Sequence, residues 1–220
     1  MREPVRAFDS VAGSYDDWYM HPQGAQVLRV ELAAVSRMLP SGGLGLEVGA
    51  GTGVFAQALR SPRREIVCLD PSPEMIKRAR GRGLAAVMGA VGNLPFKPES
   101  LDFSYMTTVL EFLDDPVKAF SEVRAAAKAG SPLVVLFINS LSEWGRFYTM
   151  LGSRGDPVFR HARLRCLGEL EGLLGEAGYV VEESLGALTT GPMEPSVGTG
   201  LTAPSDACGV IAVKAVPAHS

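Results

Sequence analysis

The stretch Leu44-Gly45-Leu46-Glu47-Val48-Gly49-Ala50-Gly51-Thr52-Gly53 decides the fold class. A short apolar strand over Leu44–Val48 leads directly into a glycine turn, and a helix is predicted over Val54–Arg60. Glycine permits positive φ angles in the turn and lets a ligand approach the backbone closely. The following helix start offers free N–H groups and the positive end of the helix dipole. This unit therefore predicts a ligand site at the end of a parallel strand.

Strands and helices alternate after this unit. Further strands are predicted at Glu65–Leu69, Leu84–Met88, Leu101–Met106 and Leu133–Ile138, with helices at Pro73–Arg80, where Ser72 is the expected N-cap, and at Asp115–Ala127. Continuously apolar strands separated by helices are typical of a parallel sheet that is covered on both faces. We therefore expect an α/β fold with a Rossmann-like, doubly wound sheet.

The flanking segments complete one predicted domain. A helix is expected over Gly24–Leu39, with Leu28, Leu32, Val35 and Leu39 on its buried face. A helix at Leu167–Ala177 and strands at Tyr179–Leu188 and Gly209–Val216 follow the core. The predicted organisation is a single domain over 1–220, with a helical cap (1–43), a cofactor-binding core (44–138), a variable acceptor segment with a helix (139–178) and a final strand pair (179–220). The long connection 189–206 is expected to be mobile or functional.

Composition narrows the class of protein. The 220 residues are 46% hydrophobic and 20% charged, which excludes a disordered or coiled-coil chain. A net charge of −3 argues against binding nucleic acid or an anionic membrane through bulk charge. The longest apolar run, 132–138, is far shorter than the roughly 20 residues that span a bilayer, and residues 1–9 carry no signal-peptide pattern. Isolated cysteines give no metal-site spacing, so we expect a cytoplasmic protein without a bound metal.

Two carboxylates point to the kind of ligand. Asp70 ends the second strand about 20 residues after Gly51, the spacing expected of a carboxylate that holds ribose hydroxyls; the alternative is a cap for the next helix. Val54 stands where the dinucleotide-binding motif has its third glycine. The sequence therefore does not match the form of this motif that binds a pyrophosphate. Glu47 lies within a buried strand, where a carboxylate is costly unless it is paired. A cationic nucleoside fits both features, and S-adenosylmethionine is such a molecule.

At these residues the sequence resembles the class I S-adenosylmethionine-dependent methyltransferases. It is most similar to the small "type 11" group, which is related to quinone- and biotin-pathway methyltransferases. The matching stretches are residues 46–53, 69–75, 93–96 with 101–103, and 109–116, together with the N-terminal segment 8–18.

The resemblance implies a seven-stranded sheet whose last strand is antiparallel and lies next to the sixth. The cofactor-binding residues that it implies are Tyr15, Glu47, Gly49, Ala50, Gly51, Asp70, Pro71, Ser72, Met75, Val91 and Thr107. Asp70 would bind the ribose, and Ser72 and Met75 would line the adenine. Glu47, the turn backbone and Thr107 would surround the methionine moiety. Tyr15, with Trp18, would close over the cofactor.

The sequence departs from the family at two positions. Ala90 stands where the family often has an acid that contacts the adenine, which leaves backbone near Val91, Asn93 or water for that contact. Glu111 and Phe112 stand where a histidine is common.

A general base is needed only if the acceptor must lose a proton. The candidates are His21, Glu111, His161 and Tyr19, and no one of them is singled out.

Segments 15–24, 139–165 and 189–206 are expected to cover the acceptor site. The aromatic residues Trp144, Phe147, Tyr148 and Phe159 favour an apolar or aromatic small molecule, or else pack a cap helix.

The leading hypothesis is a methyltransferase that uses S-adenosylmethionine and acts on a small-molecule acceptor by in-line transfer, without nucleic acid and without a membrane span. The alternatives are a nicotinamide-dependent oxidoreductase and a non-catalytic S-adenosylmethionine-binding regulatory module. The sequence leaves the oligomeric state open.

Overall fold

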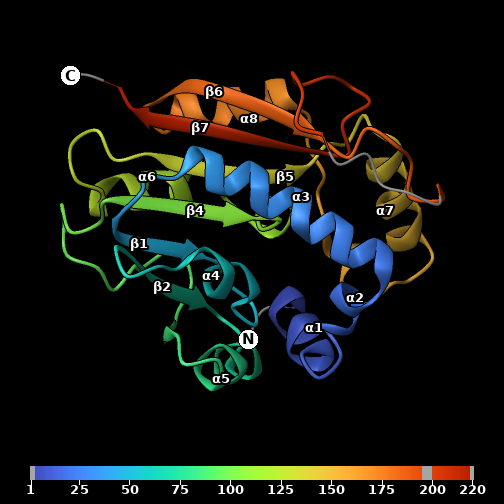
Figure 1. Ribbon diagram of the computed structural model, residues 1–220, viewed down its shortest axis with the longest axis horizontal. Helices are drawn as coiled ribbons and strands as arrows, with labels where there is room; N and C mark the ends of the chain where they lie inside the picture. The colour runs from blue at the N-terminus through green and yellow to red at the C-terminus, as the bar shows by residue number, and fades with distance from the viewer. Residues whose placement is uncertain (1–2, 195–199, 219–220) are drawn as a thin grey trace.

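The computed structural model describes residues 3–194 and 200–218, which contain a seven-stranded sheet of order β3-β2-β1-β4-β5-β7-β6 (Figure 1). The strands are β1 (Gly43–Val48), β2 (Arg64–Asp70), β3 (Ala85–Met88), β4 (Phe103–Thr107), β5 (Leu133–Ile138), β6 (Tyr179–Ala187) and β7 (Val210–Pro217). Strands β1 to β5 pair in parallel, whereas β7 runs antiparallel between β5 and β6. The predicted α/β sheet, with its antiparallel last strand beside the sixth, is confirmed.

The helices connect and cap these strands. They are α1 (Glu3–Val11), α2 (Asp17–Met20), α3 (Pro22–Met38), α4 (Val54–Leu59), α5 (Pro73–Gly81), α6 (Pro116–Ala126), α7 (Glu143–Ser153) and α8 (Leu167–Glu176), with short 3₁₀ turns η1 (Leu110–Phe112) and η2 (Phe159–His161). The elements predicted in the core are recovered to within a few residues. The sequence pattern predicts no separate helix at the positions of α1, α2 and α7.

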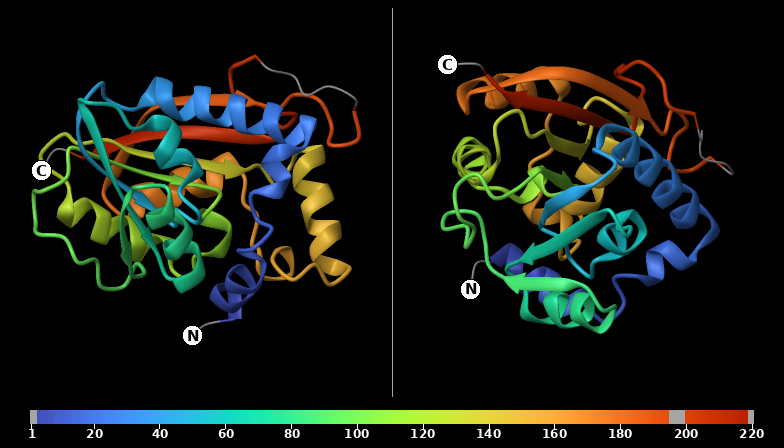
Figure 2. Two further views of the ribbon diagram at one scale, coloured as in Figure 1. Left: turned by 60° about the horizontal axis from the view of Figure 1, so that its bottom comes forward. Right: turned by 60° about the vertical axis from the view of Figure 1, so that its left-hand side comes forward.

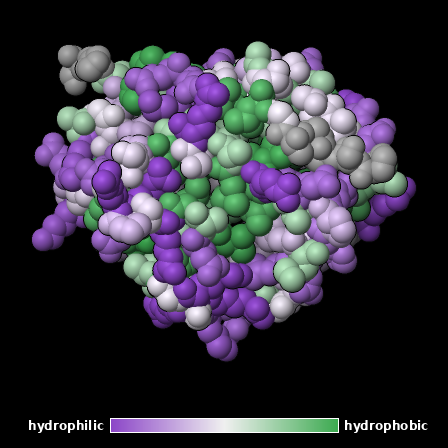
Figure 3. Space-filling model, viewed as in Figure 1, coloured by the Kyte–Doolittle hydropathy of each residue, from purple (hydrophilic) through white to green (hydrophobic). Residues whose placement is uncertain are grey.

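Helices cover both faces of the sheet. Helices α3 and α4 lie on one face and α6 and α8 on the other (Figure 2). Alternate residues of β4 accordingly enter different cores: Phe103 and Tyr105 pack beneath α3 and α4, and Met106 packs on the opposite side. Every residue of β5 is buried, which explains its unbroken apolar sequence. On the α3 side of the surface, apolar residues gather over α3 and α4 (Figure 3).

The buried face of α3 overlaps the predicted one only in part. Leu28 and Leu32 are only half-buried. The buried stripe instead comprises Gly24, Val27, Val30, Glu31, Ala34, Val35 and Met38. Val35 belongs to both stripes and Leu39 is also buried, so the prediction was right for these two residues and missed the small residues and the carboxylate beside them. The observed stripe places Glu31 in the interior.

The carboxyl ends of β1, β2, β4 and β5 meet at one edge of the sheet, and α1, α2 and α7 lie at that edge (Figures 1 and 2). Parallel α/β sheets bind ligands at this edge.

Within 3–194 and 200–218, no helix has the length and apolar character needed to cross a bilayer. The same residues contain no cluster of metal-ligating side chains.

Candidate functional site

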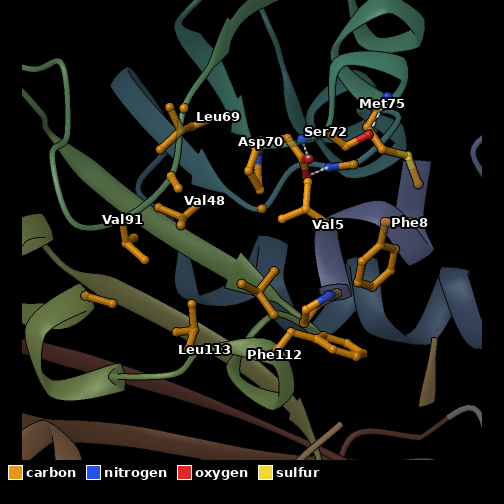
Figure 4. A pocket seen from close by; sticks show the side chains of 18 of the residues that line it. Val5, Phe8, Val48, Leu69, Asp70, Ser72, Met75, Val91, Phe112 and Leu113 are labelled. Carbon is orange, nitrogen blue, oxygen red and sulfur yellow. Dashed lines mark hydrogen bonds between the residues drawn. The ribbon is translucent and has the colours of Figure 1, made fainter. Parts of the chain in front are cut away.

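A cavity of about 700 Å³ opens at the carboxyl edge of the sheet. The ends of β1 to β4 form its floor, the starts of α5 and α6 form two sides, and α1 with η1 closes it from the opposite direction. Figure 4 shows Val5 and Phe8 of α1 opposite the side chains of Asp70 and Ser72. The cavity therefore lies between the core and the N-terminal segment.

The glycine turn shapes the cavity floor. Gly49 and Gly51 have φ angles of 68° and 54°, which favour glycine. A Cβ at Gly49 would come within 2.3 Å of Val109 Cγ2, so packing also requires glycine there. A Cβ at Gly51 would meet only Met75 Sδ, at 4.0 Å, and would project into the cavity. The backbone at Gly51 is thus open to a ligand.

Asp70 joins the turn to α5. One carboxylate oxygen accepts a hydrogen bond from Gly51 N at 2.8 Å, and the other accepts from Ser72 N at 2.8 Å. The side chain is 8% exposed, and burial raises its pKa. Ser72 is the N-cap of α5, as predicted, because its hydroxyl accepts from Met75 N at 3.1 Å. Asp70 is therefore held rigidly at the cavity wall, and each oxygen retains acceptor capacity for a ligand hydroxyl.

Glu47 lies deeper, behind the turn. It is 1% exposed, and its Oε2 accepts from Ala56 N at 3.1 Å. Its Oε1 is buried and has no hydrogen-bond partner among the described residues. Burial raises the pKa of Glu47 to about 8. The hydroxyls of Tyr105 and Thr107, together with the N–H of Ala56, oppose this rise, so the carboxyl group lies among polar groups of the protein itself.

The structure brings most of the predicted cofactor residues together. Nine of these predicted residues line the cavity: Tyr15, Gly49, Gly51, Asp70, Pro71, Ser72, Met75, Val91 and Thr107. Glu47 and Ala50 are not among the lining residues, and Ala50 packs into the core. Trp18 and Asn93 are exposed and lie outside the lining.

Sequence reasoning missed the contribution of α1. Pro4, Val5 and Phe8 line the cavity, and Phe8 meets Phe112 edge to face with ring centroids 4.9 Å apart. The spacing of Val5, Phe8 and Ala12 gives this segment an apolar side, which was the available signal.

The four candidate bases separate into two groups. His21 is exposed at the junction of α2 and α3, and His161 Nε2 accepts from Arg160 Nε at 3.0 Å on η2. Neither histidine lines the cavity. Glu111 and Tyr19 do not line the cavity either, but they belong to a group of side chains that are coupled electrostatically to Glu31, which we call the inner polar cluster and which consists of Tyr15, Tyr19, Glu31, Glu111 and Tyr148.

Both carboxylates of the inner polar cluster are buried. Glu31 is 6% exposed and Glu111 is 2% exposed. Burial, followed by repulsion from Glu111, raises the pKa of Glu31 to about 8. Burial also raises the pKa of Glu111 to about 7, although the N–H of Ile138 and the charge of Arg165 oppose this rise. Burial likewise raises the pKa of Tyr15 to about 12.

The aromatic residues of segment 139–165 have different positions. Trp144 is buried in the core, where its Nε1 donates to Thr190 O at 2.8 Å, so it fixes α7 in place. Tyr148 stacks on Phe159 with centroids 4.2 Å apart and belongs to the inner polar cluster. In the connection 189–206, Pro192 O accepts from Gln23 Nε2 at 2.7 Å, whereas residues 195–199 lie outside the described residues.

Two aspartates fasten the N-terminal segment over the cavity. Asp9 Oδ1 accepts from Ser72 Oγ at 2.5 Å and from Glu74 N at 3.1 Å. Asp16 accepts from Thr52 Oγ1 at 2.6 Å and forms an ion pair with Arg82. Charged hydrogen bonds of this kind are among the stronger ones in proteins.

Replacing both aspartates, as Asp9→Ala with Asp16→Ala, is expected to release this segment. Trypsin cleavage after Arg6 should accelerate at least about 10-fold, because each lost charged hydrogen bond is worth about 1.5–3 kcal/mol. Mass spectrometry of timed digests checks this result. The control is Asp17→Ala, which removes an exposed neighbouring carboxylate. Equal cleavage rates in the wild type and the double variant would contradict the fastening role.

Comparison with known proteins shows what this chain is similar to. A family model described as "Methyltransferase domain" matches residues 46–135. An uncharacterized protein of Mycobacterium tuberculosis (strain ATCC 25618 / H37Rv) is 36% identical over 176 residues, which cover 77% of this chain and 59% of that protein. The chain thus spans less than two thirds of the length of that relative. An uncharacterized protein of Methanocaldococcus jannaschii is 31% identical over 175 residues, or 80% of this chain and 82% of that protein.

A solved structure is similar over nearly the whole chain. It is the crystal structure of an S-adenosylmethionine-dependent methyltransferase from Thermotoga maritima, described as a possible histamine N-methyltransferase. The two chains are 29% identical with a TM-score of 0.84, and the alignment covers 97% of this chain and 99% of that one.

Proposed function

The chain belongs to the class I S-adenosylmethionine-dependent methyltransferases of the type 11 group, and we propose that it transfers a methyl group from S-adenosylmethionine to a small-molecule acceptor. The observation that carries this proposal is the pairing of Asp70 with the open backbone of Gly51 on one cavity wall. A rigid carboxylate suits two neighbouring ribose hydroxyls, and the missing Cβ leaves room beside it. The Thermotoga maritima protein is described with a small-molecule acceptor, which supports an acceptor of that size here.

The residues present fit the cofactor. Asp70 would hold the ribose hydroxyls, and Met75 with Val91 would contact the adenine. Glu47 lies behind the turn and does not line the cavity, so the backbone of Gly49 and Gly51, with Thr107, would contact the methionine end. S-adenosylmethionine supplies an electrophilic methyl group on a sulfonium. The chain's own residues hold and align the reactants and exclude water, because a displacement of this kind needs alignment more than covalent help.

Binding of the demethylated product, S-adenosylhomocysteine, tests the site directly. We expect 1 mM S-adenosylhomocysteine to raise the midpoint of thermal unfolding by several degrees, because a ligand that binds the folded state stabilises it. Differential scanning fluorimetry checks this, with NADH at the same concentration as the control for the oxidoreductase alternative. Stabilisation by NADH but not by S-adenosylhomocysteine would overturn the proposal.

Transfer is tested separately from binding. Labelled methyl groups from S-adenosylmethionine should appear on at least one member of a panel of small amines, phenols, carboxylates and thiols. Binding without transfer to any member would favour the regulatory-module alternative.

A further inference from the structure

We propose that Glu122, on α6, is a positioning residue for the methyl donor: through Gly92 it fixes the loop 89–92, whose backbone selects the adenine base. This inference rests on the proposed methyltransferase function and goes on to say how this chain recognises the donor. It stands on the lining of the cavity, on the backbone hydrogen bonds of the loop and on the contact that Glu122 makes.

The loop 89–92 follows β3 and forms one end of the cavity. All four of its residues line the cavity. Figure 4 shows Val91 and Leu113 on the side of the cavity away from Phe8. With the ribose on Asp70 and the methionine end at the glycine turn, the base of the donor reaches the end of the cavity that this loop forms.

The loop offers no polar side chain to a base. Its residues are Gly89, Ala90, Val91 and Gly92, whose side chains carry no hydrogen-bonding atom. Asn93, the next residue, is exposed and does not line the cavity. The polar edge of a base that lies against this loop therefore meets the backbone.

Two backbone donors in the middle of the loop are unused. Among the described residues, the N–H groups of Ala90 and Val91 donate no hydrogen bond. An N–H donor matches N1 of adenine, which is a hydrogen-bond acceptor. Hypoxanthine carries an N–H at the same place, so the two donors would oppose each other and one would stay unpaired. The loop can therefore distinguish the two bases, provided that its backbone is held in place.

The hydrogen bond to Glu122 holds the far end of the loop. At the near end, Gly89 N donates to Asp70 O at 3.0 Å, and at the far end Gly92 N donates to Glu122 Oε2 at 2.6 Å. Glu122 lies one helical turn after Ala119, which lines the cavity. Hydrogen bonds to a carboxylate are stronger than those between neutral groups. The two tied N–H groups flank the two unused ones.

No other contact replaces this tie. Gly92 has a φ of 116°, and a Cβ placed there would meet nothing within 4 Å, so packing does not fix this position. Within 3–194 and 200–218, Glu122 forms no ion pair, so its carboxylate is not engaged by a cation of the chain. Loss of the carboxylate would therefore free the backbone that faces the base.

Other polar side chains at the cavity belong to the start of α6 and the turn before it. Asp114, Asp115 and Lys118 line the cavity but are exposed. Asp115 Oδ1 also caps α6, because it accepts from Lys118 N at 2.9 Å. Selection of the base by these side chains would not depend on Glu122, so the two possibilities give different results in the experiment.

Isothermal titration calorimetry with two ligands tests this inference. The ligands are S-adenosylhomocysteine and S-inosylhomocysteine, in which hypoxanthine replaces adenine. We expect the wild type to prefer the adenine ligand by about 10-fold or more, because the mismatched base leaves a donor unpaired. Glu122→Ala should reduce this preference by about 5-fold or more and leave the Kd of S-inosylhomocysteine within about 2-fold of the wild type. Glu122→Gln should keep the preference, because its amide oxygen can accept from Gly92 N.

The control is Glu171→Ala, which removes an exposed glutamate of α8 and should retain the full preference. Binding of S-inosylhomocysteine by Glu122→Ala also shows that this variant is folded. Equal weakening of both ligands in Glu122→Ala would indicate a merely structural role, and an unchanged preference would assign selection to the start of α6; either result overturns the inference, as does a wild type without preference. Failure of S-adenosylhomocysteine to bind the wild type would instead overturn the proposed function, so the two failures are distinguishable.

Discussion

Asp70→Ala is expected to weaken S-adenosylhomocysteine binding at least about 100-fold. Hydrogen bonds to a charged group contribute about 1.5–3 kcal/mol each, and two ribose hydroxyls make two of them. At 1.4 kcal/mol for each factor of 10, their loss corresponds to at least two orders of magnitude in Kd. The substitution also leaves Gly51 N and Ser72 N without their acceptor, so the turn loses its fixed geometry. Isothermal titration calorimetry measures the change in Kd.

Asp102→Ala is the matched control for this experiment. Asp102 also accepts a backbone N–H, that of Leu44 at 2.8 Å, and pairs with Lys128 at 2.6 Å. It lies at the opposite edge of the sheet, beside the start of β1. Both variants lose stability, but only Asp70→Ala should lose product binding. Retention of wild-type Kd in a folded Asp70→Ala protein would exclude the ribose role.

The ligand-free protein is expected to be more stable at pH 5 than at pH 8 by several kcal/mol. Glu31 and Glu47 have pKa values raised to about 8, and that of Glu111 is raised to about 7, against an ordinary value of 4.5. Between pH 4.5 and these values the folded state binds protons that the unfolded state has lost. The free energy of unfolding then falls as the pH rises, on the order of 1 kcal/mol per pH unit for each group.

Urea unfolding at pH 5, 6.5 and 8 measures this dependence. Glu31→Gln and Glu47→Gln should each flatten the slope and stabilise the protein at pH 8, because a neutral amide does not have to be desolvated as an ion. Glu65→Gln, exposed on β2, should keep the wild-type slope. Equal free energies of unfolding at pH 5 and pH 8 would show that the three carboxyl groups are ionised in the folded state.

The core of the fold follows from local sequence features. The glycine turn, the apolar strand of β5 and the Ser72 cap each have a physical cause within a few residues, so they are visible in the sequence. The position of Asp70 is predictable for the same reason, because parallel strands bring their carboxyl ends to one edge. The sequence resemblance added the antiparallel placement of β7, which no local pattern specifies.

The acceptor side was much less predictable. The inner polar cluster joins Tyr15, Glu31, Glu111 and Tyr148, which belong to four different parts of the chain. Glu31 is buried because of how α3 is rotated about its axis, and the spacing of the leucines indicates that face only in part. A buried glutamate also looks like an ordinary polar residue in a helix until its neighbours are known. The fastening of α1 through Asp9 is similarly long-range, since Ser72 is 63 residues away.

The reversed direction of β7 has a practical consequence. Val210 pairs with Ile138 at the carboxyl edge, and the strand then runs back to Pro217 at the far side of the sheet (Figure 1). A fluorescent label, an affinity handle or a surface linker attached after β7 would therefore point away from the cavity. The same attachment before α1 would sit beside Pro4 and Val5, which line the cavity. Immobilised or fused forms of this protein for binding measurements are best joined through the end of β7.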